Sequence, residues 1–168
     1  MKIALPIESV PKNPIQYICL LLQSGLQVTS INFSPIDFGM DLLIGGFCSA
    51  IQTFMKEVFK DSINEVNADH YRIIFKYITM TNLLNEKVAI CVMIVVDKSI
   101  SNGASINSKS PLIEEILQLC EKSLVLYESS DYVSLDKNLT EIFQISLYTL
   151  IQNKYGMDHT SILQIGED

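Results

Sequence analysis

The sequence is poor in positive charge. Its 168 residues contain 12 lysines and arginines against 19 aspartates and glutamates, so the formal net charge is −7. Arg72 is the one arginine, and the lysines are scattered along the chain. Because phosphate backbones and anionic membrane surfaces bind basic patches, we expect neither to be the principal partner. Nucleic-acid binding is therefore not expected.

Short motifs of the kind that identify enzymes are also missing. The chain has no GxxxxGK[ST], HExxH, GxSxG or paired CxxC motif, and its histidines are His70 and His159. A zinc site would need cysteines from separate elements. A nucleophile–base pair of Cys91 and His70 is conceivable, but Cys91 lies in an apolar run, where burial raises a thiol pKa. We predict a protein that is not an enzyme, with no catalytic residue, no cofactor and no metal.

The few cysteines are spread out, and each lies inside an apolar run. They are Cys19, Cys48, Cys91 and Cys120. A disulfide framework would place cysteines in the loops of a small secreted domain, whereas a buried cysteine behaves as a small apolar side chain. All of them are therefore interpreted as reduced core residues.

Long apolar runs are absent as well, since the longest, Val88–Val96, has the length of a strand rather than of a membrane span. Residues 1–14 contain Pro6, Pro11 and Pro14 and do not resemble a secretory signal. With 48% hydrophobic and 18% charged residues, the chain is globular. We expect an N-terminal arm over 1–14, one domain over 15–157, a tail over 158–168, and a cytoplasmic location that includes peripheral association with membranes through partners.

The apolar patterns predict strands and helices in a definite order. Strands are expected at Ile15–Gln23, at Leu26–Ser34, on either side of Asn67-Ala68-Asp69, and at Glu86–Asp97. Helices are expected from Asp41, after Ser110-Pro111, and after Asn138, which with Glu141 resembles a capping box. The serine-rich stretch Ser99–Ser110 is expected to be a flexible loop.

These elements predict one α+β architecture. The strands at Ile15–Gln23 and Glu86–Asp97 are apolar on both faces, so they should be central neighbours with helices covering both faces of the sheet. Short hairpin loops make neighbouring strands antiparallel. We predict a β-β-α-β-β-β-α-α chain with a five-stranded, mainly antiparallel sheet in the order 2-1-5-4-3. One helix should cover one face and the two C-terminal helices the other.

The order of elements, together with the segment DLLIGGFCSAIQTFMKEVF (Asp41–Phe59), resembles a longin domain, the profilin-like module of membrane-trafficking proteins. The segment is similar to the first helix of archaeal longin-like proteins, where an acidic or polar residue precedes an aliphatic-small-small-aromatic step and then Ser-Ala-Ile. The resemblance covers the chain from Ile15 to about Tyr155. It implies a scaffold that forms a homodimer, or a heterodimer with another longin or roadblock-type protein, and binds small GTPases. Roadblock proteins are close relatives, but they usually begin with a helix.

Two surfaces supply the candidate interface residues. The apolar stripe of the first helix should pack on the sheet; its members are Leu43, Phe47, Ala50, Ile51, Phe54 and Val58. That orientation leaves another face for a partner, formed by Gly45, Ser49, Gln52, Thr53 and Lys56. The simpler alternative is that Gly46 and Ala50 let the helix approach the sheet closely. On the second strand, which lacks lysine and lies at the edge, Gln27 and Thr29 are candidates for strand pairing.

Two other functions remain open. One is a roadblock-type regulator of a GTPase. The other is a small-molecule sensor of the PAS or GAF kind, which would need a pocket with converging polar groups between the sheet and a helix. The apolar central strands favour a filled core over such a pocket.

Overall fold

The computed structural model of the chain describes residues 13–34, 41–81, 84–100, 103–125 and 137–155, with side chains over 13–34, 46–81, 84–100, 103–124 and 141–155. The expected arm, apart from Asn13 and Pro14, and the expected tail lie outside these ranges. The strands are β1 (Ile15–Leu22), β2 (Gln27–Asn32), β3 (Glu65–Asn67), β4 (Tyr71–Thr81) and β5 (Lys87–Asp97). The helices are α1 (Asp41–Phe54), α2 (Pro111–Val125) and α3 (Lys137–Tyr155), with the short helical turns η1 (Met55–Phe59) and η2 (Gly103–Ser105).

The strands form one sheet in the order β2-β1-β5-β4-β3, and every neighbouring pair is antiparallel. The predicted α+β class and strand order are therefore confirmed. β1 and β5 lie side by side, with Ile18 opposite Ile94, and their side chains are buried on both faces through most of their length. This follows from the composition of these strands, because a strand with no polar face must be covered on both sides.

Short turns connect the hairpins. Gly25 has a φ of 83° and lies in the turn closed by the Leu22 N–H, which donates to the Leu26 carbonyl at 2.8 Å. Glycine adopts this backbone conformation without a steric penalty. Asn85 has a φ of 61° at the β4–β5 connection, where asparagine is one of the few other residues that tolerate it.

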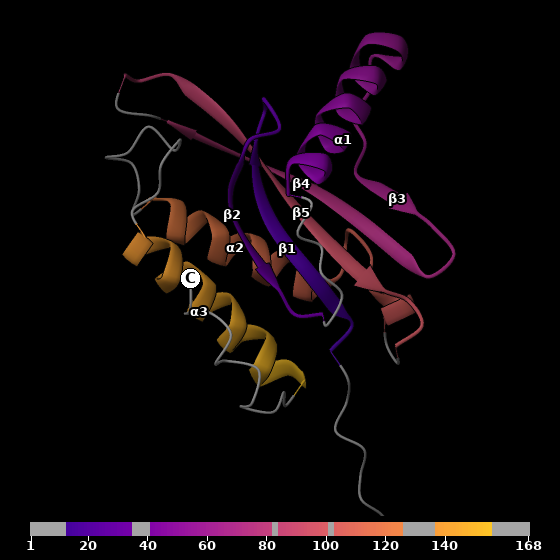
Figure 1. Cartoon of the computed structure of the whole chain (residues 1–168), viewed down its shortest axis with the longest axis vertical. Coiled ribbons are helices and arrows are strands. Elements are labelled where there is room, and N and C mark those ends of the chain that lie inside the picture. The colour runs from indigo at the N-terminus through magenta and orange to yellow at the C-terminus, as the bar shows by residue number, and fades with distance from the viewer. Residues whose placement is uncertain (1–12, 35–40, 82–83, 101–102, 126–136, 156–168) are drawn as a thin grey trace, which may run out of the picture.

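Each face of the sheet packs against its own helices (Figure 1). α2 and α3 bury Ile113, Ile116 and Leu147 against the face that carries Ile18 and the other even-numbered residues of β1. The opposite face carries Tyr17, Cys19 and Leu21 of β1 and contacts α1 through Cys48. The predicted distribution of helices, one on one face and two on the other, is confirmed.

The predicted orientation of α1 is wrong. Its apolar stripe was expected to pack on the sheet, but Phe47 and Phe54 are 53% and 54% exposed, and Ala50 is exposed too. Gly46 is also exposed, and a Cβ built on it would meet no atom within 4 Å. Gly46 and Ala50 therefore do not serve close packing on the sheet. The helical spacing identified an apolar face but not what covers it.

The loop before α2 makes specific contacts in its described part. Gly103 is buried, and the Ser108 N–H donates to Glu65 Oε2 at 3.1 Å. The Arg72 guanidinium donates to the carbonyls of Ala104 and Ile106. Although the sequence suggested a flexible loop, these bonds hold it against the β3–β4 hairpin.

Candidate binding cavity between helix α1 and the sheet

Helix α1 contacts the sheet through a small area centred on Cys48. Among the described side chains of α1, Cys48 alone is buried, at 3% exposure. Its Sγ donates to Met93 Sδ of β5 at 3.2 Å. Further along the helix, Gln52 Nε2 lies 3.5 Å from the Ile63 carbonyl. Because few side chains of α1 pack on the strands, space remains between the helix and the sheet.

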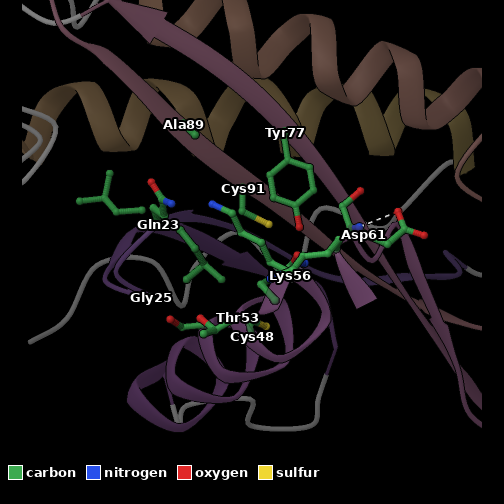
Figure 2. A pocket seen from close by; sticks show the side chains of 15 residues that line it. Gln23, Gly25, Cys48, Thr53, Lys56, Asp61, Tyr77, Ala89 and Cys91 are labelled. Atoms are coloured by element: carbon green, nitrogen blue, oxygen red, sulfur yellow. Dashed lines mark hydrogen bonds between the residues drawn. The ribbon is translucent and has the colours of Figure 1, made fainter. Parts of the chain in front are cut away.

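That space is a cavity of about 650 Å³, open to the surface. Its size falls within the range of pockets that bind small organic molecules. Figure 2 shows α1 on one side and the strands β4 and β5 on the other, with the side chains of Lys56, Tyr77 and Cys91 close together between them. The cavity thus has a helical wall and a strand wall.

The strand wall is mainly apolar. It includes Leu21 near the end of β1, Ala89 and Cys91 of β5, and the ring of Tyr77 of β4. Burial raises the pKa of the Cys91 thiol from 9.0 to about 12. Cys91 is therefore a neutral side chain at physiological pH and adds to the apolar surface.

The strand side also carries polar groups, namely the Tyr77 hydroxyl and, just after β1, Gln23. Tyr77 is opposite Cys91 in the β4–β5 register, and its hydroxyl lies 3.5 Å from the Ile63 carbonyl. Burial, and then the neighbouring Cys91, raise the pKa of Tyr77 above its usual value of 10.0. The phenol therefore stays protonated at neutral pH, and its single O–H donates to the Ile63 carbonyl.

The helical wall is polar. Ser49, Gln52 and Thr53 of α1 and Lys56 of η1 line the cavity, and Lys60 and Asp61 line it just after η1. Lys60 has a φ of 54°, a left-handed conformation that terminates the helix and turns the chain toward β3. The helix thus directs hydroxyl, amide and ammonium groups toward an apolar sheet surface.

The opposite side of α1 and η1 is an exposed apolar surface. We call Phe47, Phe54, Val58 and Phe59 the outer apolar face; each is more than half exposed. The rings of Phe54 and Phe59 meet edge to face, with centroids 5.7 Å apart. The sequence pattern identified this stripe, but its exposure could not be deduced from the pattern.

The candidate interface residues of the first helix therefore face the sheet, whereas the sequence pattern predicted that they face away from it. Ser49, Gln52, Thr53 and Lys56 line the cavity rather than a face turned away from the sheet. The surroundings of Gly45 lie outside what the structure describes. Their role in binding a partner protein remains a prediction. The cavity residues that sequence reasoning missed, such as Tyr77 and Ala89, gave no signal because they lie in ordinary strand patterns.

The two candidates on β2 lie on opposite faces of the sheet. A bulge between Leu20 and Leu21 shifts the register, so that Leu20 pairs with Thr29 whereas Leu21 pairs with Gln27. Thr29 is consequently buried, at 4% exposure, on the face covered by α2 and α3. Gln27 lies on the α1 face, where its Oε1 accepts a bond from the Tyr17 hydroxyl at 3.2 Å. Thr29 is therefore not available at the surface.

The edge formed by β2 is also less open than its sequence suggested. Gln144 Nε2 of α3 donates to the Ser30 carbonyl at 2.6 Å, which occupies a group that an added strand would need. Phe33, just after β2, stacks on Tyr148 of α3 with ring centroids 6.1 Å apart. The expectation of an unprotected edge is corrected: α3 covers its middle.

The structure does not bring together the nucleophile–base pair considered from the sequence. Cys91 lies opposite Tyr77 in the β4–β5 register, and His70 lies seven residues before Tyr77 in the chain. The side chains of Cys91 and His70 are therefore about 20 Å apart along the sheet. In the part of the chain that the structure describes, no group of three or more histidine, cysteine, aspartate or glutamate side chains could hold a metal ion.

The four cysteines are free and buried, as predicted. No helix in the described ranges is long and apolar enough to cross a membrane.

Comparison with known proteins adds no assignment. Neither the scan against protein-family models nor the search of curated proteins finds a match to this chain. The features available for functional inference are therefore the cavity and the outer apolar face.

Proposed function

We propose that this protein is a non-enzymatic, longin-like interaction module of the cytoplasm. It pairs with a second copy of itself, or with a related longin or roadblock-type domain, and acts in small-GTPase regulation or membrane-trafficking complexes. The observation that carries this proposal is the outer apolar face. The strand order and the division of helices between the two faces are consistent with the resemblance to longin domains.

The outer apolar face has the composition of a docking surface. Phe47, Phe54 and Val58 recur at helical spacing and are 53%, 54% and 57% exposed. Burying one such side chain completely contributes about 1.5–3 kcal/mol, and a contiguous exposed apolar patch commonly marks a binding site.

A matched pair of double variants tests this function. Phe47→Ser with Phe54→Ser removes two rings from the outer apolar face. Ile142→Ser with Ile145→Ser removes two side chains of similar exposure, 53% and 62%, from α3 on the other side of the sheet. We expect the unmodified chain to form dimers in sedimentation velocity, or to retain a purified nucleotide-loaded small GTPase. The first variant should lose this association and the second should keep it.

Two results would contradict the proposal. A chain that stays monomeric at all concentrations and retains no small GTPase would remove the basis for an interaction module. Equal loss of association in both variants would show that the outer apolar face is not the interface.

A second candidate function, binding of a small molecule by a sensor domain, is favoured by the cavity. Polar groups of α1 converge there on one side of a 650 Å³ space, which is the feature that such a sensor requires. A thermal-shift screen of small metabolites should then raise the melting temperature for at least one compound, since a ligand that binds the folded state alone stabilises it. Absence of any shift across a chemically diverse screen would exclude this second function.

A further inference from the structure

The two walls of the cavity differ in chemistry, and this difference limits what can occupy it. The strand wall offers Leu21 and Ala89, which cannot hydrogen-bond through their side chains. The helical wall, by contrast, offers hydroxyl, amide and ammonium groups. An entirely polar molecule would leave the strand wall without apolar contact, and an entirely apolar molecule would desolvate the helical wall without compensation. An amphiphile satisfies both walls.

The charge of the cavity identifies the head group. Lys56, Lys60 and Asp61 line it, so its local charge is positive in a chain of net charge −7. In the described part of the chain neither of these lysines forms an ion pair, whereas Lys76 and Lys154 do. The Asp61 carboxylate accepts the Ser62 backbone N–H at 2.7 Å. The lysines are therefore available to an anion from outside the chain.

The orientation of α1 supports an occupied cavity. A helix with a stripe of phenylalanines would ordinarily turn that stripe toward the sheet, because exposing it forgoes the free energy of apolar burial. Here the polar side of α1 faces the strands (Figure 2). Hydrogen bonds from Ser49, Thr53 and Lys56 to a bound head group would stabilise this orientation.

We propose that the cavity binds a small amphiphilic anion, namely a carboxylate with an unbranched apolar chain. Its chain lies on Leu21 and Ala89, and Lys56 and Lys60 hold its carboxylate. The Tyr77 ring lies between the two ends, and its hydroxyl donates to the Ile63 carbonyl at 3.5 Å. The proposal rests on the second candidate function, ligand binding, and does not depend on pairing through the outer apolar face.

Decanoate is the probe, with decanol and decylamine as neutral and cationic molecules of the same chain length. Isothermal titration calorimetry with the full chain should detect binding of decanoate, weaker binding of decanol, and no binding of decylamine. The variant Lys56→Met with Lys60→Met should weaken decanoate binding roughly 10-fold, because two partly exposed charge contacts are lost, and should leave decanol unaffected.

Two further variants control the experiment. Lys109→Met with Lys122→Met removes the same charge from exposed positions that do not line the cavity, and it should bind decanoate as the unmodified chain does. Ala89→Leu adds volume inside the cavity, and it should weaken decanoate and decanol alike. Circular dichroism establishes that each variant is folded.

The outcomes separate the ligand class from the function on which it rests. If none of the three probes binds but another small molecule stabilises the chain in the thermal-shift screen, ligand binding survives and the amphiphilic anion is excluded. Decanoate binding that is unchanged in both the Lys56→Met/Lys60→Met and Ala89→Leu variants would place the probe elsewhere and overturn the proposal. If none of the probes binds and no compound of the screen stabilises the chain, both ligand binding and the amphiphilic anion are overturned.

Discussion

Gly46 and Gly103 differ in what surrounds them. Gly46 lies in α1 with open space where a side chain would be. At Gly103, a Cβ would stand 1.9 Å from the carbonyl oxygen of Asp97 and 3.1 Å from the Cβ of Pro14. The close approach of the backbone after β5 therefore requires glycine at 103 and does not require it at 46.

Alanine substitutions at these positions should have opposite effects. We expect Gly46→Ala to raise the free energy of unfolding by up to about 1 kcal/mol, because alanine favours an exposed helix. Gly103→Ala should lower it by about 1–3 kcal/mol, because the backbone must shift to relieve the contact. Urea denaturation followed by circular dichroism measures both. A stabilising Gly103→Ala would contradict the tight backbone contact.

The buried thiols predict a loss of stability in base. Burial raises the pKa of Cys48 to about 11 and those of Cys91 and Cys120 to about 12, from 9.0 in the unfolded chain. Above pH 9 the unfolded state loses these protons while the folded state keeps them, so the free energy of unfolding falls as the pH rises from 9 toward 11–12. Well below pH 9 the thiols are protonated in both states, so they do not make the free energy of unfolding depend on pH.

Denaturation in urea at pH 8, 9 and 10 tests this prediction. Each thiol contributes a slope of at most about 1.4 kcal/mol per pH unit, and Cys120→Ala should reduce the total slope. The same slope in Cys120→Ala as in the unmodified chain would show that this thiol does not titrate as described.

At the scale of elements, α3 decides whether β2 can accept another strand. Gln144 reaches across to the Ser30 carbonyl, and Tyr148 stacks on Phe33. Such contacts are one of the ways in which proteins protect an edge strand. The sequence of β2 alone, which has no lysine or proline, did not indicate this protection because the protecting residues come more than a hundred positions later.

Removing that contact should expose the edge. We expect Gln144→Ala to lower the free energy of unfolding by about 1–2 kcal/mol, since the Ser30 carbonyl loses its partner, and to increase aggregation on mild heating. Gln118→Ala, at an exposed position of α2, is the control and should change neither. Light scattering and urea denaturation give the two readouts. Identical behaviour of both variants would show that the bond does not protect β2.

For the whole molecule, the single arginine links regions that are far apart in sequence. Arg72 Nε lies 3.0 Å from Glu65 Oε1 and 2.8 Å from Asn67 Oδ1, and its guanidinium also reaches the carbonyls of the loop before α2. The arginine thus joins the β3–β4 hairpin at the sheet edge to the segment that leads into α2. A planar group with five donors can make all of these bonds at once.

Arg72→Lys should therefore not replace the native residue. Lysine keeps the charge but cannot reach several acceptors in a fixed geometry, so we expect a loss of about 1–3 kcal/mol in stability. Amide hydrogen exchange should become faster over the described loop residues 103–110. Lys87→Arg, at an exposed position of β5, is the control with the opposite substitution and should leave stability unchanged. Unchanged exchange in Arg72→Lys would mean that the loop is held by other contacts.

The sequence by itself determined the architecture: which segments are strands, which two strands are central, and which helices share a face. Local apolar patterns contain this information, because a strand with two apolar faces must lie inside a sheet that is covered by helices on both faces. The tertiary structure decided the rotation of α1, the cavity it leaves, and the placement of Thr29. The rotation of α1 and the cavity depend on contacts between distant residues, such as Cys48 with Met93. The placement of Thr29 depends on the bulge between Leu20 and Leu21, which puts Thr29 and Gln27 on opposite faces of the sheet. Helical periodicity reports that Phe47 and Phe54 share a face, but only the packing of the other elements determines whether that face meets the sheet or the solvent.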